Sequence, residues 1–176
     1  MSSIVTWPRL TRRTLLALVA MTPALRRASA QPSSGGMLAQ IIALATNQDT
    51  MALDSAGVLR RVAFRGGTPQ GHEEATRATW DLREGALTLG HIELSRGPNG
   101  LRLDMLWLLF SPDDEIPLAS LRDAFTKHFG APQDVTPSPQ SNTTLRWRGS
   151  DRSIQVVADV PGDPDMLVYG VRIGRL

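Results

Sequence analysis

The sequence contains no cysteine among its 176 residues. The chain therefore forms no disulfide, carries no lipidated cysteine, and offers no thiolate as a nucleophile or metal ligand. With only three histidines in addition, haem, iron–sulfur and closed zinc sites are disfavoured. We expect no metal and no cofactor.

Two common catalytic motifs are absent as well. No Gly-x-Ser-x-Gly segment marks a hydrolase nucleophile, and no glycine-rich loop marks a phosphate site. His72-Glu73-Glu74 lacks the second histidine of a metalloprotease helix, and its neighbours predict a solvated loop. The acids at 113–115 have no spaced partner ligands, which indicates favourable charge at a helix start instead of a calcium loop.

The first thirty residues have the pattern of an export signal. A basic start precedes an apolar run over 15–25 that is too short to span a bilayer, and Ala28-Ser29-Ala30 fits a cleavage site. Arg12-Arg13 resembles the twin-arginine motif, and Arg26-Arg27 fits the same route. An ordinary secretory signal with a chance arginine pair is the alternative. We expect a mature protein that begins at Gln31, is periplasmic or secreted, and has no stable membrane span.

Removing residues 1–30 reverses the net charge. The whole chain has 19 basic and 17 acidic residues. The five arginines of the signal leave 14 basic residues against 17 acidic ones, a net charge of −3. Proteins that bind nucleic acid need a clustered basic surface, so we expect no nucleic-acid partner.

Hydrophobic periodicity predicts an α+β fold, in which a flexible leader over 31–36 precedes a single domain over 37–176. Helical spacing predicts helices over 37–46 and 117–129. The pattern of the segment 55–71 is ambiguous: it fits a helix or a strand, and we favour a helix. Alternation predicts antiparallel strands over 75–83, 85–95, 101–110, 144–148, 153–160 and 166–173.

The helix over 117–129 has the clearest pattern. Gly130 is placed to end it, and acids 113–115 are placed to favour its start. We expect its apolar stripe to pack on an antiparallel sheet that contains Trp80, Trp107 and Trp147. The stripe consists of Leu118, Leu121, Phe125 and Phe129.

Two parts of the chain share one order of features. Gly-x-Pro-Gln occurs at 67–70 and 130–133, and Trp80 and Trp147 follow, each before a turn, a strand and a proline turn. This predicts a tandem duplication over about 55–110 and 117–176, each copy a helix followed by three strands (an α-β-β-β unit). Coincidence is the alternative, since the chain has 15 glycines and 12 prolines.

The unit that contains Gly130, Pro132 and Trp147 resembles one found in exported bacterial proteins. Outer-membrane assembly lipoproteins of the SmpA/OmlA type have it once, and secreted β-lactamase-inhibitor proteins have it twice in tandem. The resemblance covers 117–173 best. The chain lacks the lipoprotein cysteine, the Gly-hydrophobic-Thr helix opening and the inhibitors' cysteine pairs. The resemblance implies the fold class and a binding module, and it transfers no binding residue.

Two clusters of polar residues are candidate sites. Arg146 and Arg148 flank Trp147 on a strand with Arg152 nearby, which predicts a cationic surface for an acidic partner or, alternatively, an ordinary solvated face. The second cluster lies on a hairpin that turns at 97–100. A symmetric hairpin sets Glu93 opposite Asp104 and Ser95 opposite Arg102, with His91 on the same face.

The hairpin cluster allows two interpretations. In one, Arg102 lies diagonal to Glu93 and offsets the repulsion between Glu93 and Asp104. In the other, His91 and the two carboxylates form a general acid–base group or a weak metal site.

The favoured function is a non-enzymatic exported binding or interaction module for an envelope protein or peptide. Its candidate binding residues are Arg102, Arg146, Trp147 and Arg148. The alternative is a small periplasmic hydrolase or lyase that uses His91, Glu93 and Asp104. Binding is favoured because no nucleophile–base pair, metal set or cofactor loop is recognisable. The enzyme hypothesis predicts a pocket around His91 with both carboxylates in hydrogen-bond reach. The binding hypothesis predicts an open face with an arginine-lined or apolar groove.

Overall fold

The computed structural model describes residues 34–63, 66–138, 141–159 and 166–176. The expected signal sequence, the first half of the leader and the proline turn at 161–164 lie outside these ranges. Residues Gln31–Leu176 group into one compact unit. Within the described ranges, every helix is too short or too polar to cross a membrane.

Two α-helices and a 3-10 helix form the first part of the fold. α2 (Ser34–Thr46) confirms the helix predicted over 37–46 and begins within the segment expected to be a flexible leader. The 3-10 helix η2 (Gln48–Ala52) follows, and α3 (Ser55–Val62) confirms the helix favoured there. α3 begins after Asp54 because the Asp54 carboxylate accepts a hydrogen bond of 2.7 Å from a backbone N–H three residues on.

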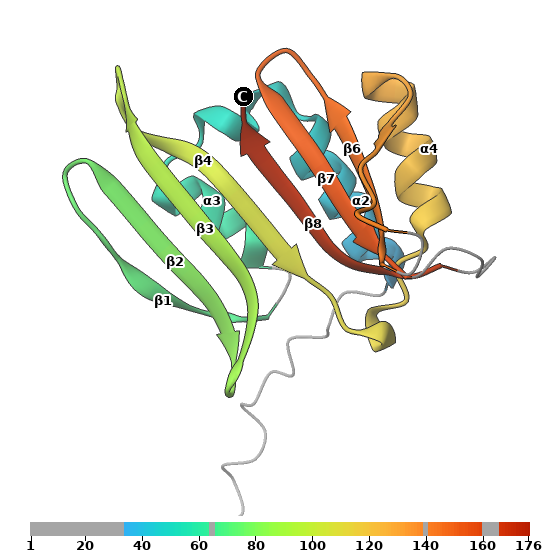
Figure 1. Cartoon of the computed structure of the whole chain (residues 1–176). Helices are drawn as coiled ribbons and strands as arrows, with labels where there is room; N and C mark the ends of the chain where they lie inside the picture. Colours follow the sequence, from blue (N-terminus) through green and yellow to red (C-terminus); the bar gives the residue numbers. More distant parts are fainter. Residues whose placement is uncertain (1–33, 64–65, 139–140, 160–165) are drawn as a thin grey trace, which may run out of the picture. The chain divides into compact units, whose positions relative to one another are not determined.

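The strands form one antiparallel sheet of eight, which confirms the α+β class. Their spatial order is β1-β2-β3-β4-β8-β7-β6-β5, so each half of the chain forms four neighbouring strands and β4 meets β8 between them (Figure 1). The strands are β1 (Thr68–Glu73), β2 (Arg77–Glu84), β3 (Leu87–Gly97), β4 (Gly100–Leu109), β5 (Gln133–Asp134), β6 (Thr143–Arg148), β7 (Arg152–Ala158) and β8 (Val168–Arg175).

Two of these strands were not predicted. β1 contains His72 and Glu73, so the prediction of a loop at 72–74 is wrong for these two residues. β5 lies between the predicted helix over 117–129 and the predicted strand over 144–148, where no strand was predicted. Both strands lie at the edges of the sheet and all their residues are exposed. They therefore lack the hydrophobic alternation by which a sequence reveals a strand.

α4 (Leu118–Phe129) is the helix predicted over 117–129. Of its predicted apolar stripe, Leu118, Leu121 and Phe125 are buried and Phe129 packs against the hydrophobic core. Gly130 ends the helix with a φ of 82°, a left-handed conformation that glycine adopts without strain.

The acids at 113–115 precede α4, as predicted, but its first turn contains no acid. Pro112–Asp114 form a separate 3-10 helix, η4. Ser111 caps it: the Ser111 hydroxyl accepts from the Asp113 N–H at 3.1 Å, and the Asp114 carboxylate accepts from the Ser111 N–H at 2.8 Å. Asp114 therefore stabilises this short turn together with Ser111.

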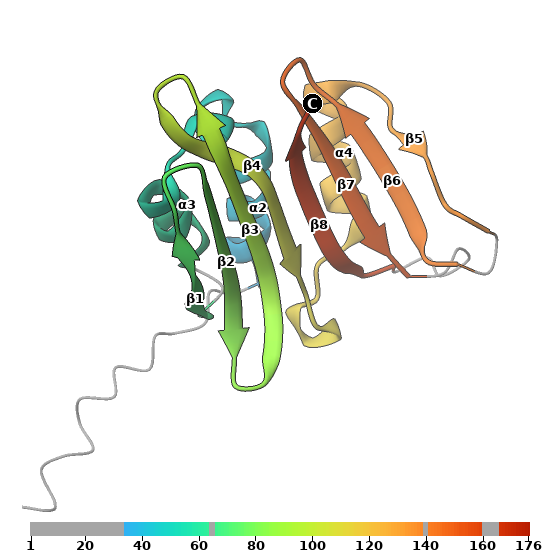
Figure 2. The ribbon, with the colours of Figure 1, turned by 60° about the vertical axis from the view of Figure 1, so that its left-hand side comes forward.

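Helices α2, α3 and α4 lie on the same side of the sheet (Figures 1 and 2). One hydrophobic cluster contains buried residues of all three helices and of the strands, among them Ile41, Val58, Phe125, Ile92, Leu106 and Ile154. Trp147 belongs to it with an exposed fraction of 1%, and its ring meets that of Phe125 edge-on with centroids 5.4 Å apart. We call the opposite side of the sheet, which no described helix covers, the open face.

Candidate functional site

The open face carries polar residues in cross-strand rows. Successive Cα partners of one row run through all eight strands as Gln70, Asp81, His91, Trp107, Arg172, Gln155, Arg146 and Gln133. The row beside it consists of His72, Thr79, Glu93, Met105, Gly174, Ser153 and Arg148. The rows are two residues apart on each strand, so they share one face. A histidine–carboxylate group thus lies on β2 and β3, and an arginine group lies on β6 and β8.

The arginine group surrounds a hollow of about 260 Å³. We call it the arginine hollow. It is lined by Arg146, Arg148, Arg172 and Arg175, with Ser153 and Gly174 between them. Gly174 has no side chain and so leaves this space open. There is room for one, since a Cβ on Gly174 would lie no closer than 3.9 Å to the Asp104 carbonyl and the Ser153 hydroxyl.

Three of these arginines form no ion pair with any described residue. Within the described residues, Arg146, Arg148 and Arg172 take part in none of the ion pairs. Arg172 contacts a sulfur atom: its Nε lies 3.1 Å from the Sδ of Met105. Glu93 and Asp104 also line the hollow, so its four arginines leave it with a net positive charge. A guanidinium matches the geometry of a carboxylate or phosphate.

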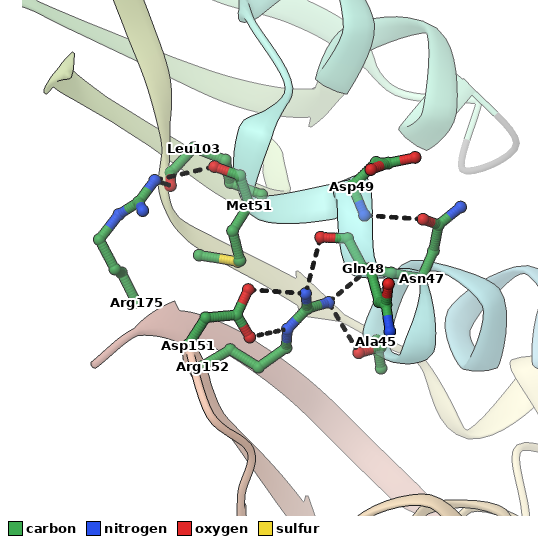
Figure 3. Close-up of polar contacts among 9 residues, drawn as sticks. All are labelled: Ala45, Asn47, Gln48, Asp49, Met51, Leu103, Asp151, Arg152 and Arg175. Carbon is green, nitrogen blue, oxygen red and sulfur yellow. Dashed lines mark hydrogen bonds and ion pairs between the residues drawn. The ribbon is translucent and has the colours of Figure 1, made fainter. Parts of the chain in front are cut away.

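Arg175 is instead held by the protein itself. Its guanidinium donates to the backbone carbonyls of Met51 and Leu103 at 2.8 and 2.7 Å (Figure 3). Its Nε lies 3.6 Å from the Asp104 carboxylate. Arg175 thus ties β8 to β4 and to η2, and forms a fixed wall of the hollow.

His91 lies between two carboxylates. Its Nδ1 is 2.7 Å from Asp81 Oδ1, and its Nε2 is 3.2 Å from Glu93 Oε1. Burial lowers the pKa of His91, but the hydrogen bonds to Asp81 and Glu93 outweigh it, and the pKa is raised above its ordinary value. The hydrogen bond from His91 in turn lowers the pKa of Asp81. Arg83 pairs with Asp81 at 3.1 Å and Arg77 with Glu93 at 3.4 Å, so both acids have cationic partners.

Asp104 does not join His91, which corrects the predicted cluster. A β-bulge between Glu93 and Leu94 pairs Glu93 with Met105 instead of Asp104. Nearer the turn the predicted register holds, and Ser95 pairs with Arg102 as expected.

Arg102 does not neutralise Glu93 either. Its guanidinium donates to the Leu101 carbonyl at 3.1 Å. Glu93 contacts Arg77 and His91. The cation beside Glu93 therefore comes from β2, the strand on the other side of β3.

The same bulge reverses the faces of the second half of β4. Without the bulge, strand alternation would set Met105 and Trp107 on the inner face with Leu103. Leu103, Leu106 and Leu108 are buried, whereas Trp107 is 42% exposed on the open face. Trp107 thus becomes part of the candidate site.

Of the predicted binding residues on β6, Arg146 and Arg148 line the arginine hollow, but Trp147 is buried in the core. Strand alternation explains this difference, because neighbours of an outward residue point inward. Trp147 is therefore a packing residue and is not accessible to a partner.

Arg152 is not a surface cation, although it was grouped with Arg146 and Arg148. It is 3% exposed. Its guanidinium donates to the carbonyls of Ala45, Asn47 and Gln48 at 3.1, 2.6 and 3.0 Å and pairs with Asp151 (Figure 3). These carbonyls lie at and beyond the end of α2, where helical partners are missing, so Arg152 caps that helix.

Sequence reasoning missed four residues of the site: Asp81, Trp107, Arg172 and Arg175. A symmetric hairpin would set Asp81 opposite Gly90, but a bulge at Leu82/Arg83 sets it opposite His91. Arg172 reaches the site through the pairing of β8 with β4 and β7. The alternation of Arg172 with buried Val171 and Ile173 was the available signal for its outward position.

No protein-family model, curated protein or solved structure matches the chain. The described residues contain no group of three or more His, Asp or Glu side chains arranged to hold a metal ion.

Proposed function

We propose that the protein is a non-enzymatic binding module that recognises an acidic group of an envelope protein or peptide in the arginine hollow. The observation that carries this proposal is the set Arg146, Arg148 and Arg172, which faces an open space without an anionic partner among the described residues. Glu93 and Asp104 also line the hollow but pair with Arg77 and Arg175, so these three arginines remain available to an external anion.

The neighbourhood of the hollow supports recognition of a protein. Trp107 is exposed beside Arg172 in the same cross-strand row. Tryptophan and arginine are the residues that most often dominate the binding free energy of protein interfaces. The open face presents Trp107 and Arg172 together, on strands whose positions are fixed by the backbone hydrogen bonds between them.

The hydrolase alternative has less support. It required Glu93 and Asp104 both beside His91, and Asp104 instead pairs with Arg175. The hollow of 260 Å³ is lined by Glu93 and Asp104 but not by His91. The charges around His91 are balanced by Arg77 and Arg83, as in a structural ion-pair network.

We further propose that the chain is exported and that its two halves arose by duplication. The basic, apolar and small-residue order of residues 1–30 supports export. Each half has four strands after its helix, one more than the predicted α-β-β-β unit, because the edge strands β1 and β5 were not predicted. The order α3-β1-β2-β3-β4 followed by α4-β5-β6-β7-β8 supports duplication. Trp80 and Trp147 lie on the second strand of each half, and each has a buried indole N–H that finds no hydrogen-bond acceptor among the described residues.

An NMR titration tests the binding proposal. Acetyl-Glu-Glu-amide should shift the side-chain Nε–H signals of Arg146, Arg148 and Arg172, whereas acetyl-Gln-Gln-amide should not, because only the first carries charge. The signals of Arg60 and Arg61 on α3 are internal controls. Equal responses to the two peptides, or shifts at Arg60 and Arg61 as large as those in the hollow, would refute the proposal.

A matched pair of variants extends the test to the natural partner. The double variant Arg146→Gln/Arg148→Gln should lose a partner retained from envelope extract. The variant Arg60→Gln/Arg61→Gln loses the same charge elsewhere and should keep that partner. Loss in both variants would indicate attraction by net charge alone.

A further inference from the structure

An apolar surface lies on the open face beside the arginine hollow. Trp107 covers Gly170: a Cβ on Gly170 would come within 3.1 Å of the indole Nε1, and Gly170 is buried although it has no side chain. Leu109 and Val157 are the cross-strand partners of Gly170 on either side. We call Trp107, Leu109 and Val157, around Gly170, the apolar platform.

The platform and the hollow lie at two positions along β8. Gly170, Arg172 and Gly174 alternate on its open side, with Val171 and Ile173 buried between them. Gly170 underlies the platform and Gly174 lies in the hollow. Four residues of a strand span about 13 Å, which is therefore the distance between the two positions.

We propose that the partner presents an extended segment with an acidic side chain and an apolar side chain four residues apart on the same side. The acid enters the arginine hollow, and the apolar side chain packs on Trp107. This inference rests on the proposed function and adds a spacing rule to it. An extended chain suits the site because its own residues i and i+4 share a face and are separated by about 13 Å. In a helix, the same two residues are separated by only about 6 Å.

Charge supports an acidic partner at one end only. Four arginines and two acids, Glu93 and Asp104, line the hollow, so its net charge is +2. The platform consists of a tryptophan, a leucine and a valine and has no charge. A partner that is acidic along its whole length would gain no binding free energy at the platform. The hollow and the platform therefore select different side chains.

Fluorescence anisotropy with labelled nine-residue peptides on a Gly/Ser scaffold tests the spacing rule on the full protein. One peptide carries Glu and Leu at i and i+4, a second carries Glu alone, and a third carries Glu and Leu at i and i+3. The first should bind about tenfold more tightly than the second, because it also buries apolar surface on the platform. The third should bind like the second, because its leucine points away from the sheet.

Two variants separate the two ends of the site. Trp107→Ala should remove the tenfold advantage of the Glu/Leu peptide over the Glu-only peptide. Gly174→Val should weaken all three peptides, because its side chain fills the hollow without meeting another atom closer than about 3.9 Å at Cβ. Circular dichroism establishes that both variants are folded.

The outcomes distinguish the two proposals. Failure of the Glu-only peptide to bind overturns the proposed function. Binding of that peptide with no gain from leucine, or with equal gain at i+3 and i+4, overturns the spacing rule alone. Sedimentation as a dimer at the assay concentration, or displacement of the peptide by dodecanoate, would assign the face to a second copy or an amphiphile and would also overturn the rule.

Discussion

Replacing Arg152 by methionine tests the link between β7 and α2. Methionine keeps much of the side-chain volume but donates no hydrogen bond. Arg152 is buried and donates to three backbone carbonyls at 2.6 to 3.1 Å (Figure 3). A hydrogen bond to a charged group contributes about 1.5–3 kcal/mol. Two of the three bonds are only partly buried, so we expect a loss of about 3–5 kcal/mol in the free energy of unfolding.

Urea denaturation followed by circular dichroism measures this loss. Arg148→Met is the control, because Arg148 is exposed on the neighbouring strand and makes no ion pair among the described residues. It should change the free energy of unfolding by no more than about 0.5 kcal/mol. A loss below about 1 kcal/mol in Arg152→Met, or equal losses in both variants, would refute the assignment of Arg152 as the cap of α2.

Three further predictions follow from packing, titration and export. Phe125 is fully buried against Trp147, so Phe125→Ala should cost about 3–5 kcal/mol in urea denaturation, and an unchanged midpoint would contradict its place in the core. The folded pKa of His91 is raised above 6.5, so the stability that protonated His91 contributes is fully present below that pH and is lost as pH rises through the folded value. The melting temperature of the wild type should therefore exceed that of His91→Gln most at low pH, and a difference that grows with pH would refute this sign. Replacing Arg12-Arg13 by Lys-Lys should block export, and unaffected export would contradict the twin-arginine route. N-terminal sequencing of the exported wild type should begin at Gln31, and a start at Met1 would contradict cleavage after Ala30.

The elements that face the core were predictable. α4 and the strands around Trp80, Ile92 and Ile154 bury one side and expose the other, so their periodicity appears in the sequence. The edge strands β1 and β5 bury no residue, and they were missed for that reason.

The composition of the candidate site was only partly predictable. Arg146, Arg148 and His91 were found because each stands out in an alternating strand. Trp107 and Asp81 were missed because each depends on a β-bulge, which shifts the partner strand by one residue and reverses the faces beyond it. A bulge is a local backbone geometry that hydrophobic pattern does not encode.

The sequence by itself determined the α+β class, the order of the core-facing elements, the absence of thiol chemistry and the export-like pattern of residues 1–30. These follow from composition and from periodicities of a few residues, which are local properties. Only the tertiary structure decided that β4 pairs with β8, which brings Trp107 beside Arg172 and completes the arginine hollow from strands of both halves. It also decided that Arg152 caps α2 and is not a surface cation, because its acceptors lie more than 100 residues earlier in the chain. Contacts of that range depend on which strands become neighbours, and no local pattern specifies this.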